Sequence, residues 1–159
     1  DTRISIYWVL SHRTFVEHLN HLRERDWISR VPGMQQVCAK VLLADVLQNA
    51  LLSWLPRTWS VPRHSAQQLA QHAFGEAGAV LIIKPNNGSQ GKNIRLSRNE
   101  EELFSALEWL PKASDGQQRG VVQKYVDNPL LLGGHKWDMR LYALVLPSVS
   151  GSMHCFLAQ

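Results

Sequence analysis

The chain has 159 residues, of which 45% are hydrophobic and 19% charged, a composition that predicts about one folded globular domain. Its net charge of +4 favours an anionic partner, such as a nucleotide, a nucleic acid or an acidic protein surface, without requiring one. No apolar run reaches the roughly 20 residues of a membrane-spanning helix, and the N-terminus lacks a signal-peptide pattern, which favours a cytosolic or cytoskeletal location.

Residues 1–60 are predicted to be mainly helical. Apolar residues recur at helical spacing in 11–26, and again after a proline-glycine break at 30–34. Pro56 and Pro62 then bracket a short extended piece.

From residue 61 onward, strands and helices alternate, which predicts a mixed α/β (α+β) fold. The segment 79–84 is apolar on both faces, as in the central strand of a sheet. A helix is expected at 99–110, because Ser97 or Asn99 can cap it and its first turn is acidic. The other expected elements are a helix at 65–74 and strands at 79–84, 93–97, 120–126 and 135–146.

The cysteines and histidines indicate neither a disulfide nor a metal site. Cys38 and Cys155 lie far apart without paired-ligand spacing, so we expect two reduced, partly buried thiols. The seven histidines show no metal-ligand spacing, and His18 and His21 share an expected helix on which surface positions are the commoner case. We therefore predict no metal ligands in this chain.

Both ends of the chain have the pattern of interior sequence. The chain begins at Asp1 without a methionine, and its last residues, GSMHCFLAQ, look like a strand without a partner. We expect an internal piece of a longer protein.

The segment KPNNGSQGKNIRLS, residues 84–97, places a loop rich in glycine and asparagine after a strand. Exposed backbone N–H groups in such a loop can bind polyphosphate. The segment is not a P-loop, because Asn86 stands where the first glycine is required and Asn93 where serine or threonine is required. Since the residues after Lys92 look extended, we predict a hairpin flap that folds over phosphates; an ordinary hairpin turn is the alternative.

The expected strand at 135–146 carries Lys136, Asp138 and Arg140 at alternating positions, so the three charges share one face. That face is either a solvated surface or a binding site. The opposite face is apolar and must lie on a core, and a lysine and an arginine flanking an aspartate can bind nucleotide hydroxyls and phosphates, which favours a site. A weaker indication is the strand end Gln123–Val126, whose backbone can pair with a purine edge.

These motifs, in this order, resemble the tubulin–tyrosine ligase-like family, whose catalytic domain is a variant of the ATP-grasp fold. The resemblance covers most of the chain: VPGMQQVCAKVLLADVLQ with Lys40 at the family's helix lysine, then LPRTWSVP, IIKPNNGSQGKNIRL, and VVQKYVDNPLLLGGHKWDMRLYALV. The last segment is the most specific. Within the family, SQGK and NPLLLGGHKWDMRLY look most like the polyglutamylase branch.

The resemblance implies a partial, ATP-grasp-like fold in three parts. Residues 1–60 would end an N-terminal helical region. Residues 61–118 would form the central subdomain, a nucleotide-binding sheet with the glycine-rich hairpin flap, and residues 119–159 would begin a truncated C-terminal subdomain.

Transferred position by position, the resemblance also implies a nucleotide site. Lys84 becomes the phosphate-binding lysine at the strand end. Lys136 and Arg140 become the catalytic residues, with Arg140 facing the transferred groups or the substrate amino acid. The other implied nucleotide contacts are the flap residues Ser89, Gln90, Gly91 and Lys92, the adenine-pocket residues Gln123, Lys124, Tyr125 and Val126, and Lys136 and Asp138.

The implied reaction is an ATP-dependent ligation of a carboxylate to an amine. A tubulin side-chain or chain-terminal carboxylate is phosphorylated by ATP, and the amine of free glutamate attacks the acyl phosphate. Lys84, Lys136 and Arg140 would neutralise the charge that grows on the phosphoryl and acyl oxygens. The implied partners are ATP, Mg²⁺, free glutamate and tubulin or microtubules, without nucleic acid or membrane, in the cytoplasm and cytoskeleton and in a cilium, flagellum or basal body.

The chain departs from the family pattern in two respects. Asn93 replaces a glycine of the flap, although asparagine tolerates positive φ better than most residues. The family's magnesium ligands lie beyond Gln159, so this segment alone should not catalyse. The alternative function is a catalytically silent relative that binds microtubules or a ciliary complex, and a ligase with a different acceptor cannot be separated from the first interpretation here.

Overall fold

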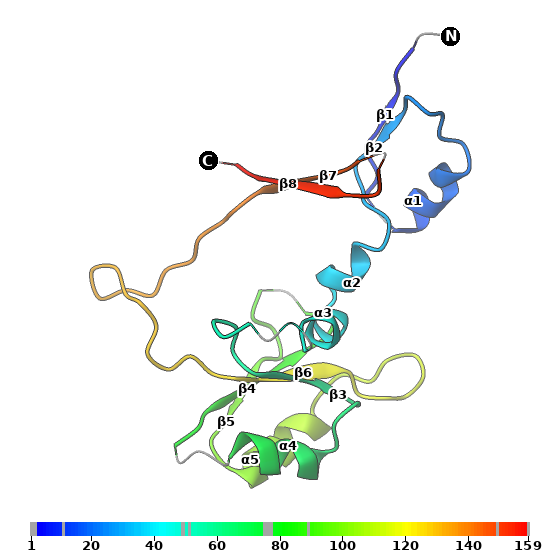
Figure 1. Ribbon diagram of the computed structural model, residues 1–159. Coiled ribbons are helices and arrows are strands. Elements are labelled where there is room, and N and C mark those ends of the chain that lie inside the picture. The colour runs from blue at the N-terminus through cyan, green and yellow to red at the C-terminus, as the bar shows by residue number, and fades with distance from the viewer. Residues whose placement is uncertain are drawn as a thin grey trace. The chain divides into compact units, whose positions relative to one another are not determined.

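The computed structural model describes residues 3–10, 12–48, 50, 52–74, 78–88, 90–148 and 150–158. The chain divides into two compact units, one formed by Gln36–Leu130 and the other by Asp1–Gln35 together with Leu131–Gln159 (Figure 1). The predicted division into 1–60, 61–118 and 119–159 stays a prediction. None of the helices in the described ranges has the length and apolar character that crossing a membrane requires.

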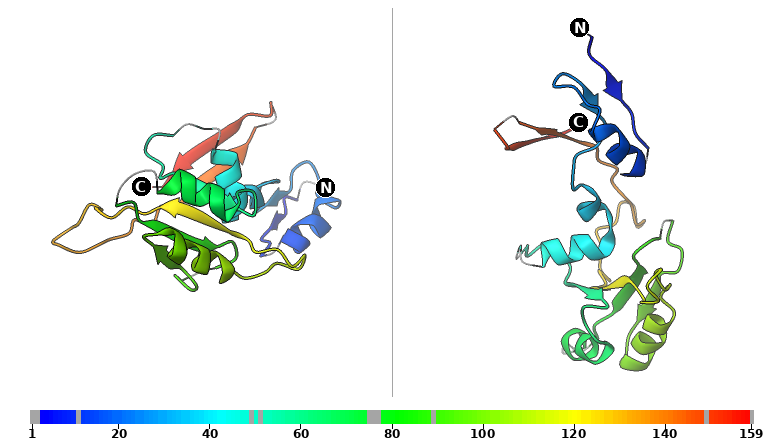
Figure 2. Two further views of the ribbon diagram at one scale, coloured as in Figure 1. Left: turned by 90° about the horizontal axis from the view of Figure 1, so that it is seen from below. Right: turned by 90° about the vertical axis from the view of Figure 1, so that its right-hand side faces the viewer.

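The Gln36–Leu130 unit is built on a four-stranded sheet. Its strands pair antiparallel in the order β3-β6-β4-β5. Helices α4 (Ala66–Ala73) and α5 (Glu100–Glu108) cover one face, and α3 (Lys40–Leu47) lies on the opposite face (Figures 1 and 2). The strands are β3 (Thr58–Val61), β4 (Leu81–Pro85), β5 (Arg95–Ser97) and β6 (Gly120–Lys124).

Local sequence signals account for the two helices over the core. Ser65 caps α4 with a full capping box, in which its hydroxyl accepts from Gln68 N–H and the Gln68 side chain accepts from Ser65 N–H. Asn99 caps α5 by accepting from Glu102 N–H at 2.8 Å. Both caps fall where the sequence predicts a helix start.

The alternation of β4 separates the core from the opposite face of the sheet. Leu81 and Ile83 are almost fully buried and pack into the core cluster with Val122 of β6 and with Leu69 and Leu103 of the two helices. Ile82 and Lys84 point the other way, toward the face that α3 partly covers. The predicted central position of this strand is confirmed, since β4 lies between β6 and β5.

The other unit contains two small sheets. Strand β1 (Ile6–Tyr7) pairs in parallel with β2 (Trp27–Ile28), and helix α1 (His12–Leu19) connects them. Strand β7 (Ala143–Pro147) pairs antiparallel with β8 (Met153–Leu157). The expected terminal strand is therefore present, but the expectation that it lacks a partner is wrong.

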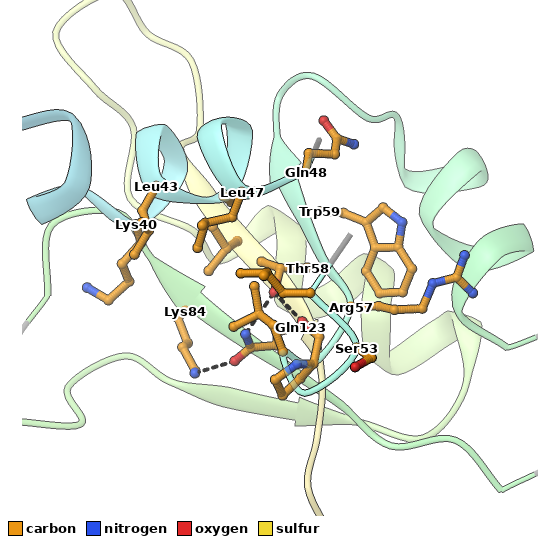
Figure 3. Close-up of a pocket in the computed structure, with 15 residues that line it drawn as sticks. Lys40, Leu43, Leu47, Gln48, Ser53, Arg57, Thr58, Trp59, Lys84 and Gln123 are labelled. Atoms are coloured by element: carbon orange, nitrogen blue, oxygen red, sulfur yellow. Dashed lines mark hydrogen bonds between the residues drawn. The ribbon is translucent and has the colours of Figure 1, made fainter. Parts of the chain in front are cut away.

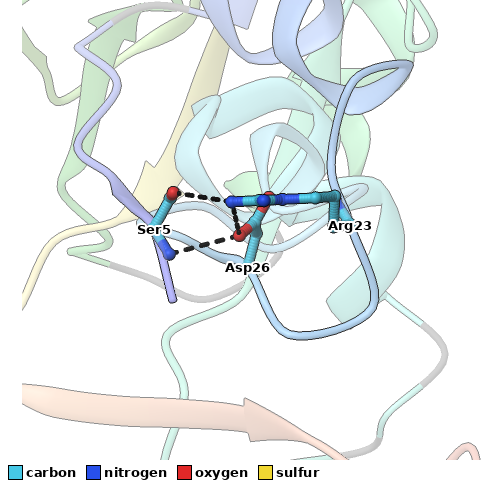
Figure 4. A network of polar contacts seen from close by, with 3 residues as sticks. All are labelled: Ser5, Arg23 and Asp26. Atoms are coloured by element: carbon cyan, nitrogen blue, oxygen red, sulfur yellow. Dashed lines mark hydrogen bonds and ion pairs between the residues drawn. The ribbon is translucent and has the colours of Figure 1, made fainter. Parts of the chain in front are cut away.

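The side chain of Asp26 closes the turn before β2 and joins it to the start of β1 (Figure 4). Its carboxylate accepts hydrogen bonds from Arg23 N–H at 3.0 Å, from Arg23 Nε at 3.2 Å and from Ser5 N–H at 3.2 Å. These bonds, chiefly those from Arg23, hold the pKa of Asp26 below its ordinary value.

The first sixty residues are less helical than predicted. They contain α1, α2 (Gln35–Cys38) and α3, but also the paired strands β1 and β2. Helix α1 ends at Leu19, earlier than the apolar spacing indicates, because the chain turns at residues 20–26 and Asp26 binds the backbone there.

The prediction of a strand across 135–146 is wrong in its first half. Residues 136–142 have no regular structure, and β7 begins only at Ala143. Among the described residues, β8 pairs with 143–147, and no strand pairs with 136–142. A segment without a neighbouring strand to pair with is not held in a sheet. The expected partial burial of the cysteines is also wrong, since Cys38 and Cys155 are free and exposed.

The close approach of β6 to β4 generates a first prediction. A Cβ atom at Gly120 would lie 2.7 Å from the Lys84 carbonyl oxygen and 2.9 Å from Leu110 Cδ2. We expect Gly120→Ala to lower the free energy of unfolding by about 1–3 kcal/mol, because it overpacks this contact. Chemical denaturation measures the loss, with Ser114→Ala at an exposed turn as the control within about 0.5 kcal/mol of the parent. A parent-like Gly120→Ala would contradict this contact.

The Asp26 turn generates a second prediction, on pH. Because the folded-state pKa is lowered, Asp26 stabilises the protein at pH values above the ordinary aspartate pKa of about 3.9, and this contribution is lost as pH falls through the folded-state pKa. The difference in unfolding free energy between the parent and Asp26→Asn should therefore be largest near neutral pH and shrink in acid. Glu24→Gln, at an exposed neighbouring position, is the control. A difference that stays constant from neutral pH into acid would refute the role.

Candidate functional site

A pocket of about 660 Å³ lies on the α3 side of the four-stranded sheet. Leu43 and Leu47 of α3 form its apolar wall, and Leu52, Ser53 and 55–57 border it (Figure 3). Two lysines, Lys40 and Lys84, also line it. An apolar pocket with a few cationic and amide groups suits an organic anion.

The structure brings together two of the predicted site residues, Lys84 and Gln123. The Lys84 ammonium donates to Gln123 Oε1 at 2.8 Å across the β4–β6 pair. Gln123 Nε2 in turn donates to Thr58 Oγ1 at 2.7 Å, and the Thr58 hydroxyl donates to the Pro56 carbonyl oxygen at 2.9 Å. Figure 3 shows Lys84, Gln123 and Thr58 in the pocket wall. Each of these side chains is half-buried.

The predicted flap lies between β4 and β5, which pair antiparallel with Ile83 opposite Arg95. Ser89 lies outside the described residues. Gln90, Gly91 and Asn93 have φ values of 57°, 72° and 59°, in the left-handed region. Asn93 thus adopts the positive φ that asparagine tolerates, and its effect on the flap stays a prediction. That the loop covers phosphates stays a prediction, and Lys92 is exposed.

The first residues of this loop are attached to the N-terminus of α3. The Lys40 ammonium donates to the carbonyl oxygens of Asn86 at 3.2 Å and Gly88 at 2.9 Å. Asn86 Oδ1 accepts from Val41 N–H at 3.1 Å, which satisfies a donor that the helix leaves open, since its N-cap Ala39 has no capping side chain. Sequence spacing gave no indication of this attachment.

The predicted adenine-binding segment begins at Gln123 and leaves the sheet after Lys124. The N–H groups of Lys124 and Tyr125 donate to the carbonyl oxygens of Arg57 and Val80, at 2.9 Å and 2.8 Å. These two N–H groups are therefore already paired. In the described part of the chain, the backbone N–H and C=O of the exposed Val126 make no such backbone hydrogen bond. Of this segment, Gln123 alone is among the pocket-lining residues.

The remaining predicted residues, Lys136, Asp138 and Arg140, belong to the other unit and are exposed in the irregular segment 136–142. Their predicted roles are not tested by this arrangement. Among the described residues, no group of three His, Cys, Asp or Glu side chains could hold a metal ion.

Sequence reasoning missed Thr58, Lys40 and Asn86 as residues that shape the site. Thr58 lies in LPRTWSVP, which the resemblance includes but to which no role was attached. No local sequence signal marks it, because its partner Gln123 lies 65 residues away and is brought opposite it only by the pairing of β3 with β6.

Comparison with known proteins supports the motif evidence. The model of the Tubulin-tyrosine ligase family matches residues 9–150. Tubulin polyglutamylase TTLL7 of Homo sapiens is 30% identical over 138 residues, which cover 81% of this chain and 14% of that protein. Tubulin polyglutamylases TTLL6 and TTLL13 of Homo sapiens are 27% and 28% identical over 151 residues, which cover 91% of this chain and 16% and 17% of those proteins.

The chain thus spans about one sixth of the length of these curated relatives. The family match extends over both units and includes each of the motifs that carry the resemblance. This chain belongs to the Tubulin-tyrosine ligase family.

Proposed function

We propose that this chain is the nucleotide-binding part of an ATP-dependent ligase that adds glutamate to tubulin. The observation that carries the proposal is the hydrogen-bonded pair of Lys84 and Gln123 in a pocket of the sheet. Both residues stand at positions where the family motifs place nucleotide contacts. The names of the relatives, all tubulin polyglutamylases, support glutamate and tubulin as the substrates.

The residues of the pocket fit a nucleotide. Its volume of about 660 Å³ lies within the usual range of small-molecule sites, roughly 300–1,000 Å³. Leu43 and Leu47 offer apolar surface for a planar base, and the ammonium groups of Lys40 and Lys84 offer positive charge for phosphates. The backbone N–H and C=O of Val126, two residues after the end of β6, are suited to pair with the edge of a base.

When bound, ATP supplies the phosphoryl group that turns a carboxylate into an acyl donor for the incoming amine. Lys84 is held where its charge neutralises phosphate oxygens, and this preorganised charge is the main catalytic contribution that such a site can make. The loop from Gln90 to Lys92 is proposed as the cover over the triphosphate. Lys136, Asp138 and Arg140 are proposed, from the family motif, to act on the nucleotide and the substrate amino acid.

Magnesium belongs to the proposal because it commonly bridges nucleotide phosphates. No ligand is assigned to it among the described residues, and no step is derived through it. The proposed partners are tubulin or microtubules and free glutamate, and the proposed location is the cytoskeleton.

The Lys84 assignment is tested by Lys84→Ala in the full-length protein. We expect the incorporation of labelled glutamate into tubulin, dependent on ATP and magnesium, to fall by about 10²- to 10³-fold, because a preorganised charge on the phosphates is lost. Lys112→Ala, at an exposed position of the same unit, is the matched control and should keep parental activity. Unchanged activity of Lys84→Ala would remove this lysine from the site. A parent that binds microtubules without incorporating glutamate would instead favour the silent relative.

The second test concerns the charged residues of the other unit. Lys136→Ala and Asp138→Ala should each lower glutamate incorporation at least about tenfold, since each removes a charge-assisted contact with nucleotide worth about 1.5–3 kcal/mol. Asp127→Ala, also at an exposed aspartate, serves as the control. If both variants retain parental activity, the irregular segment 136–142 is a solvated surface and not part of the site.

A further inference from the structure

We propose that Thr58 is a positioning residue for nucleotide binding, acting on Lys84 through Gln123. The inference rests on the proposed function, since it concerns how that site holds its phosphate-binding lysine. Thr58 itself need not touch the nucleotide. Its role follows from the polarity of the hydrogen bonds that connect it to Lys84.

The chain of hydrogen bonds can run in only one direction. An ammonium group donates and never accepts, so Lys84 must meet the carbonyl oxygen Oε1 of Gln123 and not its NH₂ group. At the other end, the Pro56 carbonyl only accepts, so the Thr58 hydroxyl proton points to it. The Thr58 oxygen is then left to accept from Gln123 Nε2, as the 2.7 Å distance indicates. The Gln123 amide is thus fixed in orientation from both sides.

The sheet register makes this arrangement rigid at the backbone. Thr58 of β3 is directly opposite Gln123 of β6, and Gln123 is opposite Ile82 of β4. Lys84, two residues beyond Ile82, lies diagonally across from Gln123 on the same face. The three side chains therefore come from three adjacent strands, and their backbone positions are set by ladder hydrogen bonds and not by a loop.

Loss of the Thr58 hydroxyl would release the amide at one end. Gln123 Nε2, half-buried beside β3, would lose its acceptor, and the side chain would gain rotational freedom. The Gln123 acceptor of Lys84 would then itself move, so nucleotide binding would have to order the Gln123 side chain as well. Loss of the hydroxyl should therefore weaken nucleotide affinity more than it slows the chemical step, because the charge of Lys84 is still present.

The test uses Thr58→Val, which keeps the β-branched shape suited to a strand and removes the hydroxyl. In the full-length protein we expect the KM for ATP and the Kd of a fluorescent ATP analogue to rise about 3- to 10-fold, with kcat reduced less than twofold. Thr58→Ser restores the hydroxyl and should stay within about twofold of the parent in both quantities. Thr58→Ala, a second variant without the hydroxyl, should behave like Thr58→Val.

A double-mutant cycle distinguishes action through Gln123 from a general effect on the strand. Gln123→Ala alone should weaken binding of the analogue. Adding Thr58→Val to it should cause little further loss, because the Gln123 amide through which Thr58 acts on Lys84 is already absent. Multiplicative losses in the double variant, or equal affinities for Thr58→Val and Thr58→Ser, would overturn the inference. If Lys84→Ala and Gln123→Ala both bind the analogue like the parent, the proposed nucleotide site itself is wrong, an outcome separate from a failure of Thr58 alone.

Discussion

The antiparallel contact between β4 and β6 is the constraint on which the candidate site depends. Gly120 allows the two strands to approach, because a Cβ there would collide with the Lys84 carbonyl oxygen and with Leu110. With this register, Leu81, Ile83 and Val122 face the helices, and Lys84 and Gln123 face the pocket. The same pairing that buries the core therefore brings the lysine and the amide together. Core and site are two faces of one strand pair, and a change in register would lose both.

A second connection links this strand pair to the loop that follows β4. The N-terminus of α3 holds the first loop residues through Lys40 and through Asn86, which caps the helix. Asn86 N–H also donates to the Arg119 carbonyl at 3.1 Å, directly before β6 begins. The start of the loop is thus fixed to a helix and to the neighbouring strand, whereas Gln90, Gly91 and Asn93 have positive φ in the turn that follows. A rigid base with a tight, polar tip is suited to cover a bound anion.

Elements that depend on local interactions could be predicted from the sequence, whereas elements that depend on contacts between distant residues could not. The helices after Ser65 and Asn99 could be predicted because capping and apolar spacing are local, and β4 because its strand is apolar on both faces. The parallel pair β1–β2 depends on contacts between residues about 20 positions apart, such as Ser5 with Asp26, and local patterns do not report them. Lys84 and Gln123 were predicted from motifs, but the role of Thr58 became visible only when strand order placed it opposite Gln123.

Lys40 adds a second positive charge to the lining of the pocket. A cation at a helix N-terminus is opposed by the helix dipole, so Lys40 would be unfavourable at this place without compensation. It donates hydrogen bonds to two backbone carbonyls, those of Asn86 and Gly88, which carry no net charge. The positive charge at the start of the loop therefore remains and adds to that of Lys84 along the same pocket. If the proposed nucleotide binds there, its phosphates would offset the positive charge of Lys40 at the helix N-terminus, so that binding would also stabilise α3 and the start of the loop.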